Sequence, residues 1–200
     1  MKRLIIATSY AFLLSACQVS PDKSGVIDYK GLSAKPGLVA FGSLAGVDGR
    51  QYLLEQDALF RSRLEGKGID TVIKESTLTL NIPGNIGFGI NSASINWNLH
   101  SILDGISPVL KEYKYTSILV LGHSDSKGDT EVNQRLSEQR AKAIHDYFMR
   151  SGVSLERLSY KGVADSDLLI KNALTTLDRA LNRRITLEIT INKTELEAEK

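Results

Sequence analysis

The apolar positions of the chain follow helical spacing in some segments and strand spacing in others. Residues 98–113 carry apolar side chains three or four positions apart, which is typical of an amphipathic helix, and Pro108 inside this pattern predicts a kink. Residues 77–82 and 184–191 alternate apolar and polar side chains, which indicates strands with one buried face. The continuous apolar run at 117–122 predicts a strand that is covered on both faces.

Five further segments complete the pattern. Helices are expected at 50–68, 131–150 and 174–182, and strands at 71–73 and 158–163. Strands that alternate with helices predict an α/β (α+β) fold, in which one mixed sheet is covered by helices in a two-layer sandwich with βαβ crossovers.

The first residues have the pattern of a secretory signal. Lys2 and Arg3 precede an apolar run at 4–14, which is too short to span a bilayer and ends in small residues. The next residues, "LSAC" at 14–17, resemble the bacterial lipobox. This resemblance implies cleavage after residue 16 and attachment of acyl chains to Cys17. The alternative is an ordinary signal peptide that ends near a buried cysteine.

Cys17 is the only cysteine of the chain, so it cannot form an internal disulfide. Several acyl chains hold a protein firmly on a membrane. Gln18, rather than Asp, follows the cysteine and resembles an outer-membrane sorting signal. We therefore expect a lipid anchor in the cell outer membrane, with the domain facing the periplasm.

Residues 17–50 have no persistent period and are rich in Ser, Gly, Lys and Pro, which predicts a flexible tether. Such a segment spans roughly 30 Å as a coil and on the order of 100 Å when stretched. We expect residues 51–76 to lead into a domain at 77–192, and 193–200 to form a polar tail. Loss of Lys2 and Arg3 would lower the 25 basic side chains by two, to 23, which equals the number of acidic ones. A near-neutral chain of this kind does not favour nucleic acid as a partner.

The helix expected at 131–150 carries polar residues in its apolar stripe. Asn133, Arg140 and Tyr147 are seven positions apart and therefore lie nearly in line. Asp125 follows the strand at 117–122, at the end of a strand where α/β folds place ligands. A buried arginine costs several kcal/mol unless an anionic group accompanies it.

Two explanations are open for these charges. In the first, Arg140 and Asp125 form an internal ion pair, and Asp125 and Asp129 cap turns. In the second, both charges face a cleft and bind the two ends of a zwitterion. The carboxylate then receives an ammonium group and the guanidinium receives a carboxylate.

The stretch "GHSDSKGDTEVNQRLSEQRAKAIHDYF" at 122–148 resembles the signature of the OmpA-like (OmpA/MotB C-terminal-type) peptidoglycan-binding domain family. Two later stretches, "SGVSLERLSYKG" and "DRALNRRITLEI", extend the resemblance, which covers about Leu78 to Ile191. Upstream, "LEGKGIDTVIKESTLTLNIPGNIGFGINSASI" resembles outer-membrane lipoproteins of this family. The resemblance implies a small α/β sandwich with a βαβαβ-type core.

The family binds the peptide stem of peptidoglycan non-covalently at meso-diaminopimelate, whose free end is a zwitterion. The binding residues of the family fall on Asp125, Arg140, Asn133, Arg183 and Asn91 of this chain. The chain departs from the family between 164 and 178, where Ala164 stands in place of the usual Gly and one residue is inserted. This loop borders the ligand site in the family, so its shape bears on binding.

Other chemistries have weaker support in the sequence. His123, Ser124 and Asp125 are adjacent, but successive strand residues point to opposite faces, which does not fit a hydrolase triad. The histidines lack zinc-ligand spacing, so neither a metal nor a cofactor is expected. Trp97 and Tyr160 are expected to be packing residues.

The expected function is therefore binding and tethering, and not enzymatic. A membrane-anchored lipoprotein would hold the outer membrane to the cell wall through peptidoglycan. The alternative is an accessory lipoprotein of a secretion, conjugation or efflux assembly, which contacts protein partners through the helix at 50–66 and the acidic tail. A cell-wall hydrolase is the third hypothesis, although the sequence shows no nucleophile or metal set for it.

Overall fold

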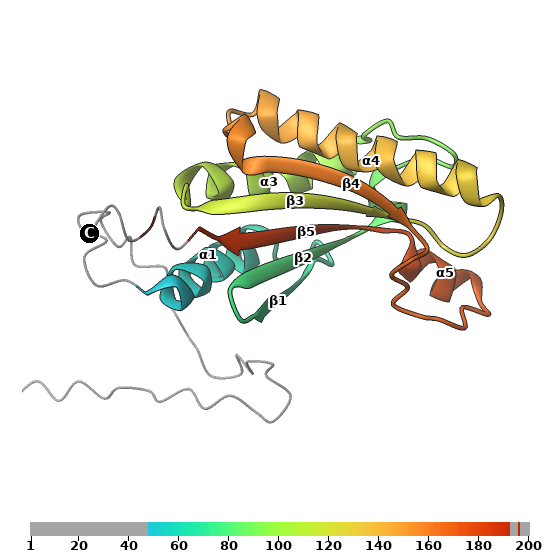
Figure 1. Cartoon of the computed structure of the whole chain (residues 1–200), viewed down its shortest axis with the longest axis horizontal. Coiled ribbons are helices and arrows are strands. Elements are labelled where there is room, and N and C mark those ends of the chain that lie inside the picture. Colours follow the sequence, from blue (N-terminus) through green and yellow to red (C-terminus); the bar gives the residue numbers. More distant parts are fainter. Residues whose placement is uncertain (1–47, 193–195, 197–200) are drawn as a thin grey trace, which may run out of the picture. The chain divides into compact units, whose positions relative to one another are not determined.

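The computed structural model describes residues 48–192 and Leu196. In these residues one five-stranded sheet runs in the order β1-β2-β5-β3-β4 (Figure 1). In chain order the elements are α1 (Gly49–Arg63), β1 (Asp70–Lys74), β2 (Thr77–Pro83), α2 (Gly84–Gly87), α3 (Trp97–Glu112), β3 (Thr116–His123), α4 (Thr130–Arg150), the 3-10 turn η1 (Leu155–Arg157), β4 (Leu158–Ala164), α5 (Thr176–Asn182) and β5 (Arg184–Ile191). The prediction of a mixed sheet with helices is confirmed.

The pairing of the strands explains why β5 lies in the middle of the sheet. β5 pairs antiparallel with both β2 and β3, whereas β3 and β4 are parallel and are joined by α4. This β3-α4-β4 unit is the one βαβ crossover among the described residues. The first residues of β5 therefore lie beside the ends of β2 and β3.

One hydrophobic core joins the sheet to α1, α3 and α4. Alternate residues of the strands, including Leu80, Val120 and Leu187, are fully buried against apolar side chains from these helices. Leu53 and Phe60 of α1 belong to the same core, so the segment before β2 is part of the packed unit. Burial of this apolar surface provides the main driving force for the fold.

The second face of the sheet is open at β3. Ser117 is exposed and Leu119 and Leu121 are half-buried, so the prediction that both faces of this strand are covered is wrong. The neighbouring residue of Leu119 on β5 is Glu188, a charged residue that a covered face would not accommodate. The uninterrupted apolar run therefore belongs to a strand with only one fully buried face.

The helix over Pro108 is continuous, since α3 runs from Trp97 to Glu112 with this proline inside it. The predicted strand at 184–191 and helix at 131–150 agree with β5 and α4 to within a residue. Residues 48–50, which were expected to lie in the tether, belong to α1 and its cap, because Asp48 caps the helix and it begins at Gly49. The signal, the lipid site at Cys17 and the tail at 193–200 lie outside the described residues, Leu196 excepted. Within the described part, none of the helices combines the length and apolarity that a membrane crossing needs.

Two glycines let α4 lie unusually close to the sheet. A Cβ atom on Gly122 of β3 would stand 2.0 Å from the carbonyl oxygen of Ser137, and one on Gly162 of β4 would stand 2.5 Å from the backbone nitrogen of Glu138. The Oγ of Ser137 also accepts a hydrogen bond from the backbone of Ala164 at 3.3 Å. This contact fixes the height of α4 above the sheet one helical turn before Arg140.

Candidate functional site

Arg140 lies in the middle of α4 with only 8% of its surface exposed. Its Nε donates to the carbonyl oxygen of Ser92 at 2.9 Å, and its Nη2 donates to the carbonyl oxygen of Gly89 at 3.1 Å. The guanidinium carbon stands 5.2 Å from the centre of the Phe88 ring. A tight turn after β2 and α2 therefore holds this side chain.

The charge of Arg140 is not balanced by a carboxylate of the described chain. Burial, and next the positive charge of Arg183, lower the pKa of the guanidinium. Carbonyl oxygens carry only partial charge, so they solvate the cation without neutralising it. The Nη1 atom has no acceptor among the described residues, so both of its N–H groups remain for an anion.

Asp125 pairs with Arg183 instead of Arg140. The Nη1 of Arg183 donates to Asp125 Oδ2 at 2.5 Å, and the backbone nitrogen of Lys127 donates to Oδ1 at 3.1 Å. The internal pair between Arg140 and Asp125 that the sequence allowed is therefore wrong. The partner of Asp125 is Arg183, which the resemblance also gave as a binding residue. Arg183 directly precedes β5, and β5 lies beside β3, whose end leads to Asp125.

Asn133 shapes the loop that carries Asp125. Its amide donates to the carbonyl oxygen of Lys127 at 3.0 Å and, more weakly, to that of Asp125 at 3.4 Å. Asp129 caps α4 by accepting from the backbone of Val132 at 2.9 Å, as expected. In this structure Asn133 is thus a positioning residue for Asp125.

Asn91 lies in the turn that holds Arg140. The turn closes where the backbone of Ser92 donates to the carbonyl oxygen of Gly89 at 3.2 Å, and Asn91 adopts the left-handed conformation with φ of 49°. Its side chain is exposed and makes no hydrogen bond with the rest of the described chain. The structure therefore brings all five predicted residues to one region, with Asn91 at its edge.

Sequence reasoning missed the three residues that hold Arg140. Phe88 contributes its ring, while Gly89 and Ser92 contribute backbone carbonyl groups, which leave no side-chain signature. In the sequence, the turn-forming residues of "FGINS" were the available signal for this turn. Tyr147, in line with Arg140 on the helix, instead donates its hydroxyl to Asp104 of α3 and ties the two helices together.

His123 and Ser124 do not form a catalytic pair. Ser124 Oγ donates to the backbone oxygen of Asp125 at 2.9 Å, and His123 is buried at the end of β3. The imidazole Nδ1 stands 3.9 Å from Asp167, whose carboxylate receives Arg184 at 2.7 Å. Burial, and next the charge of Arg184, lower the pKa of His123 to about 4.

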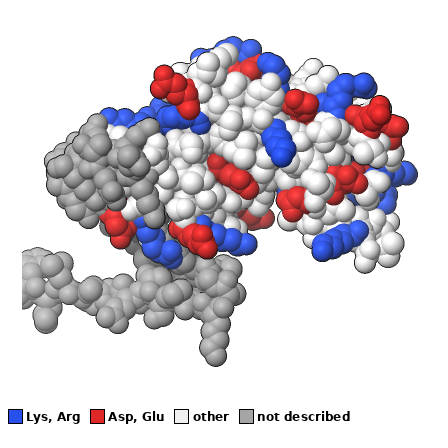
Figure 2. All heavy atoms as spheres, viewed as in Figure 1, with Lys and Arg blue, Asp and Glu red and all other residues white. Residues whose placement is uncertain are grey.

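The chemistry of the Arg140 site is therefore that of an anion receptor with one carboxylate nearby. Two guanidinium groups and one carboxylate leave an excess of one positive charge. No group of three or more metal-ligating side chains occurs in the described part of the chain. On the face drawn in Figure 2, basic and acidic side chains are interspersed, without a broad patch of one sign.

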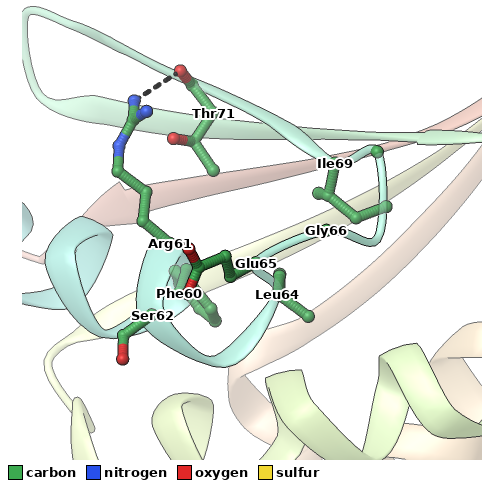
Figure 3. A pocket seen from close by; sticks show the side chains of 9 residues that line it. Phe60, Arg61, Ser62, Leu64, Glu65, Gly66, Ile69 and Thr71 are labelled. Carbon is green, nitrogen blue, oxygen red and sulfur yellow. Dashed lines mark hydrogen bonds between the residues drawn. The ribbon is translucent and has the colours of Figure 1, made fainter.

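A pocket lies elsewhere, between the end of α1 and β1, and contains none of the five residues (Figure 3). Arg61 spans it and donates to Asp57 at 2.8 Å and to the backbone of Thr71 at 3.0 Å. Because its cation is already engaged by these groups, this pocket offers no comparable anion site.

Comparison with known proteins identifies the domain. The model of the OmpA family matches residues 87–183, which contain all five site residues. Probable lipoprotein YiaD of Escherichia coli K12 is 33% identical over 141 residues, covering 70% of this chain and 63% of that protein. Peptidoglycan-associated lipoprotein of Mesorhizobium japonicum is 35% identical over 95 residues, covering 48% of this chain and 56% of that protein. The chain thus spans less than two thirds of either relative.

Solved structures agree with the fold. A MotB-like protein from Desulfovibrio vulgaris superposes with a TM-score of 0.65 at 22% identity, covering 72% of this chain and 94% of that one. The cell wall anchor of the T6SS from Pseudomonas aeruginosa superposes with a TM-score of 0.60 at 23% identity, covering 67% of this chain and 96% of that one. From the matched signature and the family model we conclude that residues 87–183 form a domain of the OmpA family, and the solved structures share its fold.

Proposed function

We propose that this domain binds the peptide stem of peptidoglycan at the free end of meso-diaminopimelate. The observation that carries the proposal is the buried guanidinium of Arg140, which is held in place by carbonyl oxygens and lacks a carboxylate partner. A ligand carboxylate would accept hydrogen bonds from the N–H groups at Nη1 and balance the charge. Hydrogen bonds between two charged groups of this kind are about twice as strong as neutral ones.

Asp125 supplies the complementary half of the site. Its carboxylate is already hydrogen-bonded to Arg183 and to the backbone of Lys127, and a carboxylate has lone pairs for further donors. The ammonium group of the ligand binds to these lone pairs, while Arg183 orients the carboxylate. Asn133 maintains the loop around Asp125, and Asn91 contacts the ligand from the turn beside Arg140.

We also propose that the chain is anchored in the outer membrane through acyl chains on Cys17. The lipobox resemblance supports this anchor, and both relatives are named as lipoproteins. The tether at 17–50 would let the domain reach the wall from the membrane. Confinement near the wall raises the effective concentration of ligand, so each single contact can be weak.

The test is co-sedimentation of the full chain, in detergent, with purified peptidoglycan sacculi. Arg140→Ala should remove most binding, because it removes the cation that receives the carboxylate. Arg135→Ala is the matched control, since this arginine is exposed on the same helix and should leave binding unchanged. Equal binding by Arg140→Ala and the parent chain would contradict the proposal. We expect no soluble muropeptides to be released in any of these samples.

A second function, an accessory role in an envelope assembly, is favoured by the fold similarity to a T6SS cell wall anchor. In that case wall binding positions the chain beside protein partners. Complete digestion of the wall before solubilisation separates the two ideas. A defined complex that survives digestion would favour the assembly role, whereas loss of all association would favour tethering alone.

A further inference from the structure

Trp97 is the only tryptophan of the chain and is 82% exposed, so the expectation that it packs in the interior is wrong. It occupies the first position of α3, directly after the helix cap at Asn96. Large aromatic side chains usually bury most of their surface in packing or at an interface. A single tryptophan left open to solvent is therefore a candidate contact for a ligand.

A hollow of about 250 Å³ lies beside this indole. Its lining combines apolar and hydrogen-bonding side chains: Lys67, Ile86, Trp97, Asn98, Ser101 and Ile102. Lys67 Nζ donates to Ser101 Oγ at 2.7 Å, which sets the two polar groups side by side. Asn98 adds an exposed amide that can both donate and accept.

The walls of the hollow are held in fixed positions. Asn96 Oδ1 accepts from the backbone of Leu99 at 3.0 Å, and its amide nitrogen donates to the carbonyl oxygen of Ile86 at 2.8 Å. The backbone of Asn96 also donates to the carbonyl oxygen of Gly87 at 3.1 Å. A backbone that is held in this way lowers the entropic cost of binding a ligand.

The hollow and the Arg140 site are connected by one short segment. Ser92 holds Arg140 through its carbonyl oxygen, and Phe88 and Ile95 form a β-bridge behind this turn. Trp97 follows Ser92 by five residues, so the two lie at most about 18 Å apart. A ligand that has a peptide joined to a sugar chain could contact both places.

We propose that the hollow beside Trp97 is a subsite for the N-acetylated glycan strand of the wall. The apolar face of a sugar ring packs on the indole, and Ile86 and Ile102 receive the methyl of an acetamido group. Asn98, Ser101 and Lys67 bind hydroxyl and carbonyl oxygens. The combination of one aromatic face with a few placed polar groups is typical of small-molecule sites. This inference rests on the proposed function, because peptidoglycan joins the glycan to the stem peptide.

The sole tryptophan provides a direct measurement. The full chain in detergent is titrated with a soluble oligomer of N-acetylglucosamine, which has no stem peptide, and tryptophan fluorescence is recorded. A saturable change in intensity or wavelength is expected. Calorimetry with Trp97→Ala should then show that the affinity for the oligomer falls by up to about tenfold, as the loss of one aromatic contact implies. The exposed position of Trp97 means that this variant should fold, which circular dichroism checks.

Two controls separate this subsite from the peptide site. Leu155→Ala, which also removes an exposed apolar side chain but in η1, should leave glycan binding unchanged. Arg140→Ala should keep glycan binding and lose the stem peptide, while Trp97→Ala should weaken glycan binding and keep the stem peptide. Stem-peptide binding without glycan binding would overturn the subsite alone. Glycan binding that Trp97→Ala leaves intact would overturn it too. Glycan binding that needs Trp97, without stem-peptide binding, would support it and contradict the peptide site.

Discussion

At Arg140 a positive charge is kept nearly buried although no carboxylate accompanies it. Taking a guanidinium out of water costs several kcal/mol, and two carbonyl oxygens and one aromatic ring offset only part of that cost. A hydrophobic side chain of similar volume would serve stability better. The residue is therefore explained by a ligand more readily than by packing.

His123 couples stability to pH at the same end of the sheet. Its pKa falls from the ordinary 6.5 to about 4 in the folded chain, because the ring is buried and Arg184 lies nearby. Between these two values the unfolded chain binds more protons, so the free energy of unfolding should decrease as the pH falls from 6.5 to 4. The contribution of this histidine is at most about 3 kcal/mol.

Chemical denaturation at several pH values checks this effect. The variant His123→Gln cannot titrate, so its stability should depend less steeply on pH between 6.5 and 4 than that of the parent. If the free energy of unfolding depends on pH equally steeply in the two proteins, His123 is not the cause of the pH dependence.

At the scale of elements, the approach of α4 to β3 and β4 decides where Arg140 stands. Gly122→Ala would place a Cβ against the backbone of Ser137, which cannot rotate away, so α4 must shift. We expect a loss of about 3 kcal/mol in the free energy of unfolding, near the upper range for overpacking, together with weaker stem-peptide binding.

Urea unfolding of Gly122→Ala measures the loss, and Gly105→Ala serves as its control. In α3 the added Cβ would meet the flexible end of Leu64 at 3.2 Å, so we expect a change below about 1 kcal/mol in either direction. Similar behaviour of the two variants would mean that the close approach at Gly122 is unimportant.

Periodicity predicted most elements because one face of each strand and helix packs into a single core. It was wrong at Leu119, which lies half-buried on the open sheet face, and the separate expectation that Trp97 packs was wrong as well. Ala164 has a backbone conformation that a residue with a side chain rarely adopts. It stands where the family usually has Gly, and it adopts a left-handed φ of 44° that favours glycine. Hydrogen bonds from Ser124 to its oxygen and from its nitrogen to Ser137 hold this conformation.

At the scale of the whole described domain, the order of the strands assembles the site. β5 is last in the chain but lies between β2 and β3, and this places Arg183 against Asp125. Local spacing along the sequence does not contain that order, so the sequence left open an ion pair between Asp125 and Arg140. The five residues themselves came from the family resemblance, and the structure added the turn at 88–92 that holds Arg140.

The central claim is that Arg140 receives the carboxylate at the free end of diaminopimelate, and the most direct measurement compares two stem peptides. One peptide contains meso-diaminopimelate, and the other contains L-lysine, which lacks that carboxylate. Calorimetric titration of the full chain should show a preference of roughly tenfold to a hundredfold for the first peptide, as a charged hydrogen bond implies. Arg140→Ala should bind both peptides weakly and equally, while Arg135→Ala keeps the preference. Equal binding of both peptides by the parent, or a preference that survives Arg140→Ala, would contradict the account.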